Sequence, residues 1–424
     1  MKNFTKLFFI ALLMIGFSMN MVAQFTLSGE FRPRTEYRHG YKALAGVDQD
    51  AAFFTDQRTR LNFDYKSKGY RFFVSMQDVR VWGAQKQLVV TDGYTTTLHQ
   101  AFAEIFLNDQ FTVKAGRQEI IYDDHRIFGS VGWAQQARSH DAAIFKYNKD
   151  GFKLDVGLAF NQNAAGLKGT TYTVAKSYKT FQYLWLHKKM DKINFSILAL
   201  NNGQQVKDFN GNFISGVHYT QTIGTRVGYK AGKLAAFLSY YYQGGAMADS
   251  IGTKLNASLL GLDVAYKATD NLTVVAGFEQ QSGNSQVTAS DEKNAFTPYF
   301  GTNHKFNGFM DYFYVGNHGQ SVGLQDAYLK FKYKKGKLNA GLDTHYFLAA
   351  ADVNDGTGKA MAAGLGTEFD AYLGTKIAEG VAFKLGYSHM IGTETMQQLK
   401  GGDFNETSNW AYMMVVIKPT FIKK

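Results

Sequence analysis

The chain has 424 residues, a formal net charge of +11, 45% hydrophobic and 15% aromatic residues, and a mean hydropathy of -0.25. It contains 43 Gly, three Pro and no Cys, which excludes disulfide scaffolds, thiolate metal sites, Cys nucleophiles and a lipoprotein anchor. The aromatic content excludes an intrinsically disordered chain. The positive charge fits nucleic acid, an anionic membrane or an acidic substrate, and composition does not separate these.

Residues 1–23 are predicted to be a secretory signal peptide. Lys2 and Lys6 form a basic start, an apolar run covers residues 7–17, and small residues lead to Ala23, after which we expect cleavage. An uncleaved anchor helix is the alternative. Residues 24–424 then form a single mature domain, with a formal charge of +9 because two lysines are lost. No later stretch approaches the roughly 18 apolar residues of a transmembrane helix.

From residue 25 onward, apolar and polar residues alternate in the period-2 pattern of β-strands. Counting such segments predicts about 18 strands. The polar face carries charged residues and glycine, which the dry core of a sandwich would not accept. One example places Leu154, Val156, Leu158 and Phe160 opposite Lys153, Asp155, Gly157 and Asn161.

Connections between the predicted strands alternate in length, and a Tyr repeatedly ends the strand before a short turn. The longest loop covers residues 282–323. Short periplasmic turns, long extracellular loops and an aromatic girdle are typical of a closed antiparallel transmembrane β-barrel. In lipid only a closed barrel pairs every backbone group of a sheet, and a barrel of this size leaves an aqueous lumen. We therefore predict an all-β fold with this architecture; a secreted all-β protein is the alternative.

Ten of the eleven arginines lie between Arg32 and Arg138. Guanidinium groups recognise carboxylates and phosphates in planar, bidentate geometry, so a lumen wall of arginines would attract anions. The alternative is that arginine–carboxylate pairs only brace the wall. The strand residues assigned to the lumen are Arg32, Arg34, Arg38, Arg58, Arg60 and Arg80, with the acidic partners Glu30, Glu36, Asp56, Asp64, Asp78 and Glu104. Strand parity slips near Met76 and Gln77, so we expect a bulge there, before Asp78 and Arg80.

Residues 116–136 mix arginine, acids and aromatic residues more densely than a mobile loop would, so we expect this loop to fold into the pore. Its Gly-Arg-Gln-Glu, Tyr-Asp-Asp-His-Arg and Gly-Trp-Ala-Gln-Gln runs, followed by Asp141, resemble the alginate export family of outer-membrane barrels. The resemblance implies an 18-stranded monomer with an arginine-lined constriction that passes an anionic uronic-acid polymer. The positions that it covers are Arg117, Gln118, Asp123, Asp124, Arg126 and Asp141, and we add Arg138 to the candidate path.

The sequence does not predict an enzyme. Ser139, His140 and Asp141 are contiguous on a strand, so their side chains alternate between faces and cannot align as a triad. We expect His125 to join ion pairs of the pore loop rather than bind a metal, and we expect no cofactor. Nucleic-acid binding is not expected, because the basic residues line a lumen or occupy turns.

We therefore predict a monomeric channel for anionic solutes, such as a polyuronate like alginate, in the outer membrane of a Gram-negative bacterium. The expected partners are outer-membrane lipid, an anionic polysaccharide or small anions, and periplasmic export proteins for a polymer. Two alternatives stay open, namely a general or small-solute porin and a surface adhesion protein that uses the loop of residues 282–323.

Overall fold

The computed structural model describes residues 23–88 and 96–424, so the predicted signal peptide lies outside the described residues except for Ala23. The described residues form strands and three short helical segments. The strands are β1 (Gln24–His39), β2 (Ala52–Lys66), β3 (Tyr70–Val81), β4 (Thr96–Phe106), β5 (Phe111–Gln118), β6 (His140–Lys149), β7 (Phe152–Phe160), β8 (Thr180–Lys189), β9 (Ile193–Lys207), β10 (Phe213–Ala231), β11 (Leu234–Ala246), β12 (Lys254–Lys267), β13 (Leu272–Gln281), β14 (Glu292–Lys293), β15 (Leu324–Lys335), β16 (Leu338–Leu348), β17 (Gly364–Ala378), β18 (Val381–Gly392), β19 (Ser408–Ile417) and β20 (Thr420–Lys423). The helical segments are η1 (Asn303–Lys305), α2 (Val315–His318) and α3 (Glu394–Lys400).

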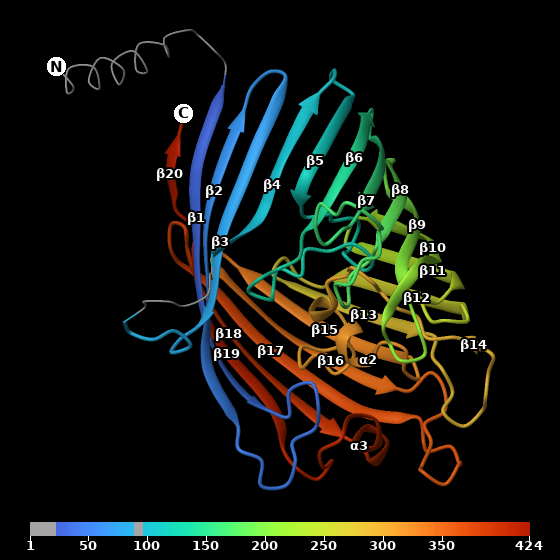
Figure 1. Cartoon of the computed structure of the whole chain (residues 1–424). Coiled ribbons are helices and arrows are strands. Elements are labelled where there is room, and N and C mark those ends of the chain that lie inside the picture. The colour runs from blue at the N-terminus through green and yellow to red at the C-terminus, as the bar shows by residue number, and fades with distance from the viewer. Residues whose placement is uncertain (1–22, 89–95) are drawn as a thin grey trace, which may run out of the picture.

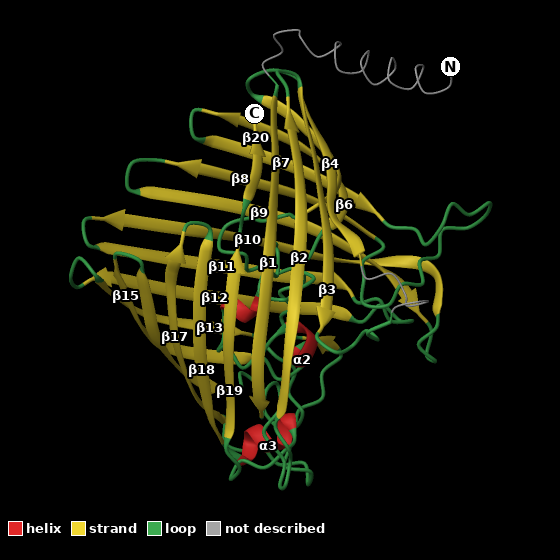
Figure 2. Ribbon diagram, turned by 90° about the vertical axis from the view of Figure 1, so that its left-hand side faces the viewer, coloured by secondary structure: helices red, strands yellow, loops and turns green. Residues whose placement is uncertain are grey.

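Eighteen of the twenty strands in the described residues close into one antiparallel barrel, in which β19 pairs with β1 (Figures 1 and 2). The two remaining strands are short. β14 pairs with β12 inside a long loop, and β20 continues the line of β19 along β1. The predicted strand count and closed topology are confirmed. No helix within the described residues is long and apolar enough to cross a membrane.

The two faces of the wall follow the alternation in the sequence. Large apolar side chains such as Leu61, Phe145 and Leu262 are exposed on the outside, as lipid requires. Glycines on the inner face allow a tyrosine of the next strand to lie flat on the wall, and a Cβ on Gly157 would lie only 2.0 Å from the ring of Tyr183. The other pairs of this kind are Gly224 with Tyr241, Gly277 with Tyr328, Gly341 with Tyr372 and Gly386 with Tyr412. This packing accounts for part of the high glycine and tyrosine content.

Both ends of the described chain lie at the end of the barrel that carries the short turns, which is the periplasmic end in this fold class (Figure 1). The opposite end carries the long loops. Two of them turn into the barrel: loop A, residues 119–139 between β5 and β6, and loop B, residues 282–323 between β13 and β15. Loop A therefore folds into the pore as its composition predicts.

Apolar packing fills part of the lumen where loops A and B meet the wall. Phe128 of loop A is 1% exposed within a cluster that includes Phe181 and Leu200 of the strands. Met310 and Tyr312 of loop B are fully buried in a second cluster. The predicted aqueous lumen is thus narrowed by packed protein where these loops meet the wall.

Candidate functional site: the lumen constricted by two loops

Loops A and B bind each other across the lumen through backbone hydrogen bonds. The amide of Gly129 donates to the Phe300 carbonyl at 2.8 Å, and the amide of Thr302 donates to the His125 carbonyl at 2.9 Å. Arg138 of loop A donates to the Gly301 carbonyl of loop B at 3.1 Å. Together the two loops form one constricting unit.

Three arginines of β1 and β2 hold loop A against the wall. Arg32 donates to Gln135 Oε1 at 2.7 Å, and Arg58 donates to the carbonyl of the same residue at 3.2 Å. Arg34 donates to the Trp133 carbonyl at 2.8 Å, and its guanidinium carbon lies 4.4 Å from the centre of the Trp133 ring. These arginines are only 6%, 5% and 3% exposed, respectively, because loop A covers them.

Carboxylates on the same strands compensate this buried positive charge. Arg34 pairs with Glu36 and with Asp56, each at 2.8 Å, and Arg58 pairs with Glu30 at 2.5 Å. Buried guanidinium groups require such partners and hydrogen bonds to offset their desolvation. These arginines therefore brace the barrel wall and loop A, because their N–H groups already bind protein atoms.

Two other arginines of the predicted wall, Arg38 and Arg60, are less completely buried than Arg32, Arg34 and Arg58. Arg38 pairs with Glu36 at 2.9 Å, and its side chain is 30% exposed. Arg60 donates to Gln77 Oε1 at 3.0 Å and has no carboxylate within 4.0 Å in the described part of the chain. Arg60 is thus a wall arginine whose charge no carboxylate of the described residues pairs with.

Arg80 and Asp78 lie on the outer face of the barrel, so their predicted position in the lumen is wrong. The expected slip in strand parity near Met76 does not occur against β2, since the β2–β3 register is continuous. Gln77 is buried on the inner face, and Met76 is 40% exposed on the outer face. Alternation then places Asp78 and Arg80 outward, where they bind each other at 2.5 Å. The irregularity lies instead between β3 and β4.

Arg117 and Asp141 also alternate away from the constriction. They pair at 3.0 Å across β5 and β6, and Arg117 shares its face of β5 with the outward-facing Phe111. Gln118, by contrast, is fully buried on the inner face. The pair lies at the strand ends and reaches only the rim of a cavity on the side of the long loops.

The charged residues of loop A bind the wall opposite β1. Arg126 forms an ion pair with Glu279 of β13, and Asp124 pairs with Arg226 of β10 at 2.7 Å. Asp123 accepts a hydrogen bond from Trp185 Nε1 at 3.2 Å. Loop A is therefore attached to opposite sides of the barrel.

His125 lies between these acids without forming a metal site. Burial lowers its pKa, and the neighbouring Lys305 ammonium adds to this effect. Among residues 23–88 and 96–424, no group of three or more His, Asp or Glu side chains has an arrangement that could hold a metal ion.

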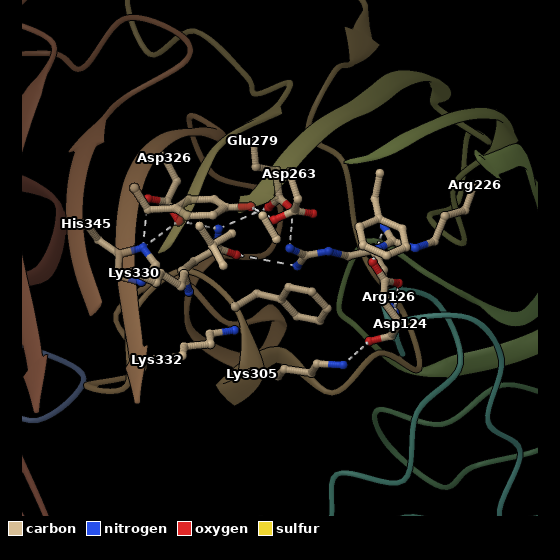
Figure 3. Close-up of a pocket in the computed structure, with 16 residues that line it drawn as sticks. Asp124, Arg126, Arg226, Asp263, Glu279, Lys305, Asp326, Lys330, Lys332 and His345 are labelled. Carbon is tan, nitrogen blue, oxygen red and sulfur yellow. Dashed lines mark hydrogen bonds and ion pairs between the residues drawn. The ribbon is translucent and has the colours of Figure 1, made fainter. Parts of the chain in front are cut away.

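The cavity between Arg126 and the facing wall has a volume of about 250 Å³ (Figure 3). We call it the Arg126 cavity. Its basic lining residues are Arg126, Arg226, Lys305, Lys330 and Lys332, and its acidic ones are Asp124, Asp263, Glu279 and Asp326. Lys332 lines the cavity without an ion-pair partner in the described residues. This cavity lies on the short-turn side of the loops.

Sequence reasoning missed the basic residues of the Arg126 cavity that lie outside loop A. Lys330 and Lys332 occupy the polar face of an alternating strand, so the signal for their lumenal position was present. Arg226 was set aside because it lies far from the other arginines in sequence. Lys305 belongs to loop B, and no local pattern indicates that this loop folds inward.

Three further cavities adjoin the loops. The Lys114 cavity, of about 340 Å³, is lined by Arg71, Lys114 and Lys146 and by Glu104 and Glu119. Asp64 and Glu104 of the predicted set both bind Arg71, at 2.8 and 3.2 Å. The Lys384 cavity, of about 300 Å³, has Lys305 and Lys384 and no carboxylate in its lining. The outer chamber, of about 770 Å³ on the long-loop side, is lined by Arg117, Arg138 and Lys176 and by Asp141.

No protein-family model matches the chain, and no curated protein matches it in sequence. Several solved structures share its fold. A BenF-like porin from Pseudomonas fluorescens Pf-5 aligns with 94% of this chain and 99% of its own, at 12% identity and a TM-score of 0.62.

Two similar structures were solved with a small carboxylate. Pseudomonas aeruginosa OccK2 (OpdF), in complex with glucuronate, is 12% identical, with a TM-score of 0.63 over 94% of this chain and 98% of its own. Pseudomonas aeruginosa OpdK, with vanillate, is 11% identical, with a TM-score of 0.61 over 93% and 99%. At these identities the likeness shows the fold alone: the chain has the closed 18-stranded barrel of outer-membrane porins.

Proposed function

We propose that the chain is a non-catalytic outer-membrane channel for small anionic solutes. The observation that carries this proposal is the charge of the cavities. Basic residues outnumber acidic residues in the Arg126, Lys114 and Lys384 cavities and in the outer chamber. Charged linings select ions by sign, and low-dielectric walls strengthen the effect.

The residues proposed for the solute path either line a cavity with their charged group or lack a carboxylate that pairs with it. From the set predicted by sequence these are Arg60, Arg126 and Arg138. Arg226, Lys305, Lys330 and Lys332 join them from the Arg126 cavity. Arg32, Arg34 and Arg58 act on the path indirectly, by holding loop A in place.

Loops A and B limit the size of the solute that can pass. Their contacts extend from β1 and β2 to β10, β13 and β17, so packed protein crosses the lumen. Small solutes pass such a constriction more readily than a polymer does. The binding of glucuronate and vanillate by two proteins of the same fold is consistent with small carboxylates.

Export of a polyuronate is the narrower second candidate, and it would require periplasmic partners. Its support is the motif resemblance to the alginate export family around Asp123, Asp124 and Arg126, three residues that the structure places on the constricting loop A. Surface adhesion has less support, because Met310, Tyr312 and Val322 of loop B are fully buried. A single chain closes the whole barrel, so we propose a monomer.

Targeting belongs to the same proposal. Residues 1–23 would direct export and be removed, and the mature protein would begin at Gln24. N-terminal sequencing of the protein purified from outer membranes tests this point.

The function is tested by recording single channels in planar bilayers under a potassium chloride gradient. We expect a reversal potential that reports preference for chloride, and we expect monomeric glucuronate to carry current or interrupt it. Equal permeability to potassium and chloride would overturn the anion-channel proposal. Block by oligouronates at much lower concentration than by the monomer would favour the polymer candidate.

A further inference from the structure

We propose that the outer chamber is a binding site in which Arg138 holds the carboxylate of a ring-bearing solute before that solute reaches the constriction. This inference rests on the proposed anion channel and adds a recognition site on its long-loop side. Three features of the chamber carry it: an arginine without an acidic partner, an aromatic floor and an excess of cations.

Arg138 differs from nearly all other arginines of the chain. Nine of the eleven arginines have a carboxylate oxygen within 4.0 Å. Within the described residues Arg138 has none, and the single hydrogen bond of its side chain goes from Nη1 to the Gly301 carbonyl at 3.1 Å. A guanidinium carries five donors in a planar fork that matches a carboxylate, so most of its donors are left for a ligand.

The charge of Arg138 persists although its surroundings are poorly solvated. Burial lowers its pKa to about 10, which leaves the guanidinium protonated at neutral pH. A partly buried cation without a counter-ion is costly, and an incoming anion compensates it. The Arg138 guanidinium is thus an uncompensated positive charge beside the chamber.

The floor of the chamber is aromatic and is built by loop B and by the segment that leads into β8. Phe300 and Tyr299 of loop B are half-buried, with ring centroids 6.0 Å apart. The Tyr178 ring lies 5.3 Å from that of Phe300, and its hydroxyl lies 3.1 Å from His140 Nδ1. Aromatic rings that remain partly exposed offer faces and edges to a flat or cyclic solute.

The remaining charges of the chamber also favour an anion. Arg117 at the rim is paired with Asp141. Lys176 lines the chamber and has no ion-pair partner among the described residues. The three basic residues and one acid leave a net positive lining. A volume of about 770 Å³ lies within the range of roughly 300–1,000 Å³ that is usual for small-molecule sites.

The test uses the full mature chain in planar bilayers, with the probe added on the long-loop side. The probes are glucuronate and benzoate, which share a ring and a carboxylate. Acetate lacks the ring, and glucose lacks the carboxylate. We expect both ring acids to interrupt single-channel current with a lower apparent Kd than either control probe.

Arg138→Gln removes the charge but keeps a donor for the Gly301 carbonyl. We expect it to raise the apparent Kd for the ring acids at least tenfold, and we expect Arg138→Lys, which lacks the planar fork, to give a smaller increase. The matched control is Arg80→Gln, which removes the same charge from the outer face of the barrel and should leave the Kd unchanged. Insertion and unit conductance of each variant report whether the barrel is intact.

The outcomes separate this inference from the function on which it rests. An anion-selective channel whose ring-acid Kd is the same in wild type and Arg138→Gln overturns the site and leaves the proposed function standing. A channel without anion selectivity overturns both. Tight binding of glucuronate alone supports the site and assigns it to a sugar acid, whereas tight binding of benzoate alone supports it and assigns it to an aromatic acid. Binding of acetate as tight as that of the ring acids overturns the role of the aromatic floor.

Discussion

Two parts of the barrel wall, β1 with β2 and β15, use basic residues in different ways. On β1 and β2, Arg32, Arg34 and Arg58 are buried under loop A and bind its backbone or nearby carboxylates. On β15, Lys330 and Lys332 line the Arg126 cavity, and Lys330 also pairs with Asp343 at 3.3 Å. The first wall positions the constriction, and the second is available to a solute. A lumen-facing basic residue is therefore accessible to a solute only where no loop covers it.

The largest effect is expected from breaking the arginine wall with Arg34→Met. The substitution leaves Glu36 and Asp56 without this buried partner and frees the Trp133 carbonyl. Removing one partner of a buried ion pair costs about 3–5 kcal/mol. We expect a lower midpoint of thermal unfolding in detergent and a noisier, larger single-channel current as loop A loosens.

Arg80→Met on the outer face is the control for that experiment, because its pair with Asp78 is partly exposed. A current and a thermal midpoint for Arg34→Met that match those of this control would show that Arg34 does not anchor loop A.

The next effect concerns the β15 wall. The double variant Lys330→Gln, Lys332→Gln removes two lumenal charges while most of the contacts of loops A and B remain. A unit charge acting over 4 Å is worth about 1 kcal/mol in water, so we expect the preference for chloride to fall by about fivefold. Reversal potentials measure this. A smaller loss of selectivity here than in Arg34→Met would reverse the roles that we assign to the two walls.

Ionic strength should separate the walls without any substitution. The screening length falls from about 10 Å at 0.1 M salt to about 3 Å at 1 M. We expect anion selectivity to decline over this range, because the cavity charges face solvent. The thermal midpoint should change little, since buried pairs are screened less. Selectivity that is unaffected by salt would contradict a role for solvent-facing lysines.

A last effect, on stability rather than on current, is expected at α3. Burial lowers the pKa of Lys400 to about 7, and its ammonium donates to the Asn317 carbonyl at 2.8 Å. Unfolded lysine titrates near 10.4, so between pH 7 and about 10.4 the unfolded state binds more protons. Stability should therefore rise with pH across this window and be flat below it.

Thermal unfolding at several pH values tests the role of Lys400, with Lys400→Met as the comparison. The variant should lose this part of the pH dependence. If the thermal midpoint changes with pH in the same way in both proteins, Lys400 does not cause this pH dependence.

Much of the fold was predictable because strand alternation is a local property. The segments around Leu154 and Leu329 show the period of two without knowledge of their neighbours, and the turn lengths give the two ends of the barrel. The same alternation misplaced Arg80 and Asp78, since one assumed bulge near Met76 inverts every following side chain. Arg117 and Asp141 were assigned from a motif, and they line the outer chamber at the strand ends rather than the constriction.

The sequence by itself determined the closed barrel, its outward apolar face, its charged and glycine-rich inner face and the inward folding of loop A. The sequence did not determine which basic residues remain without a protein partner for their charge. Arg32 meets Gln135 about a hundred positions later in the chain, and Arg126 meets Glu279 even farther along. No local pattern encodes such contacts, because they depend on where loops A and B come to rest against the wall. Only the tertiary structure therefore distinguishes Arg34, whose charge is used by the protein, from Arg138, whose charge is left for a ligand.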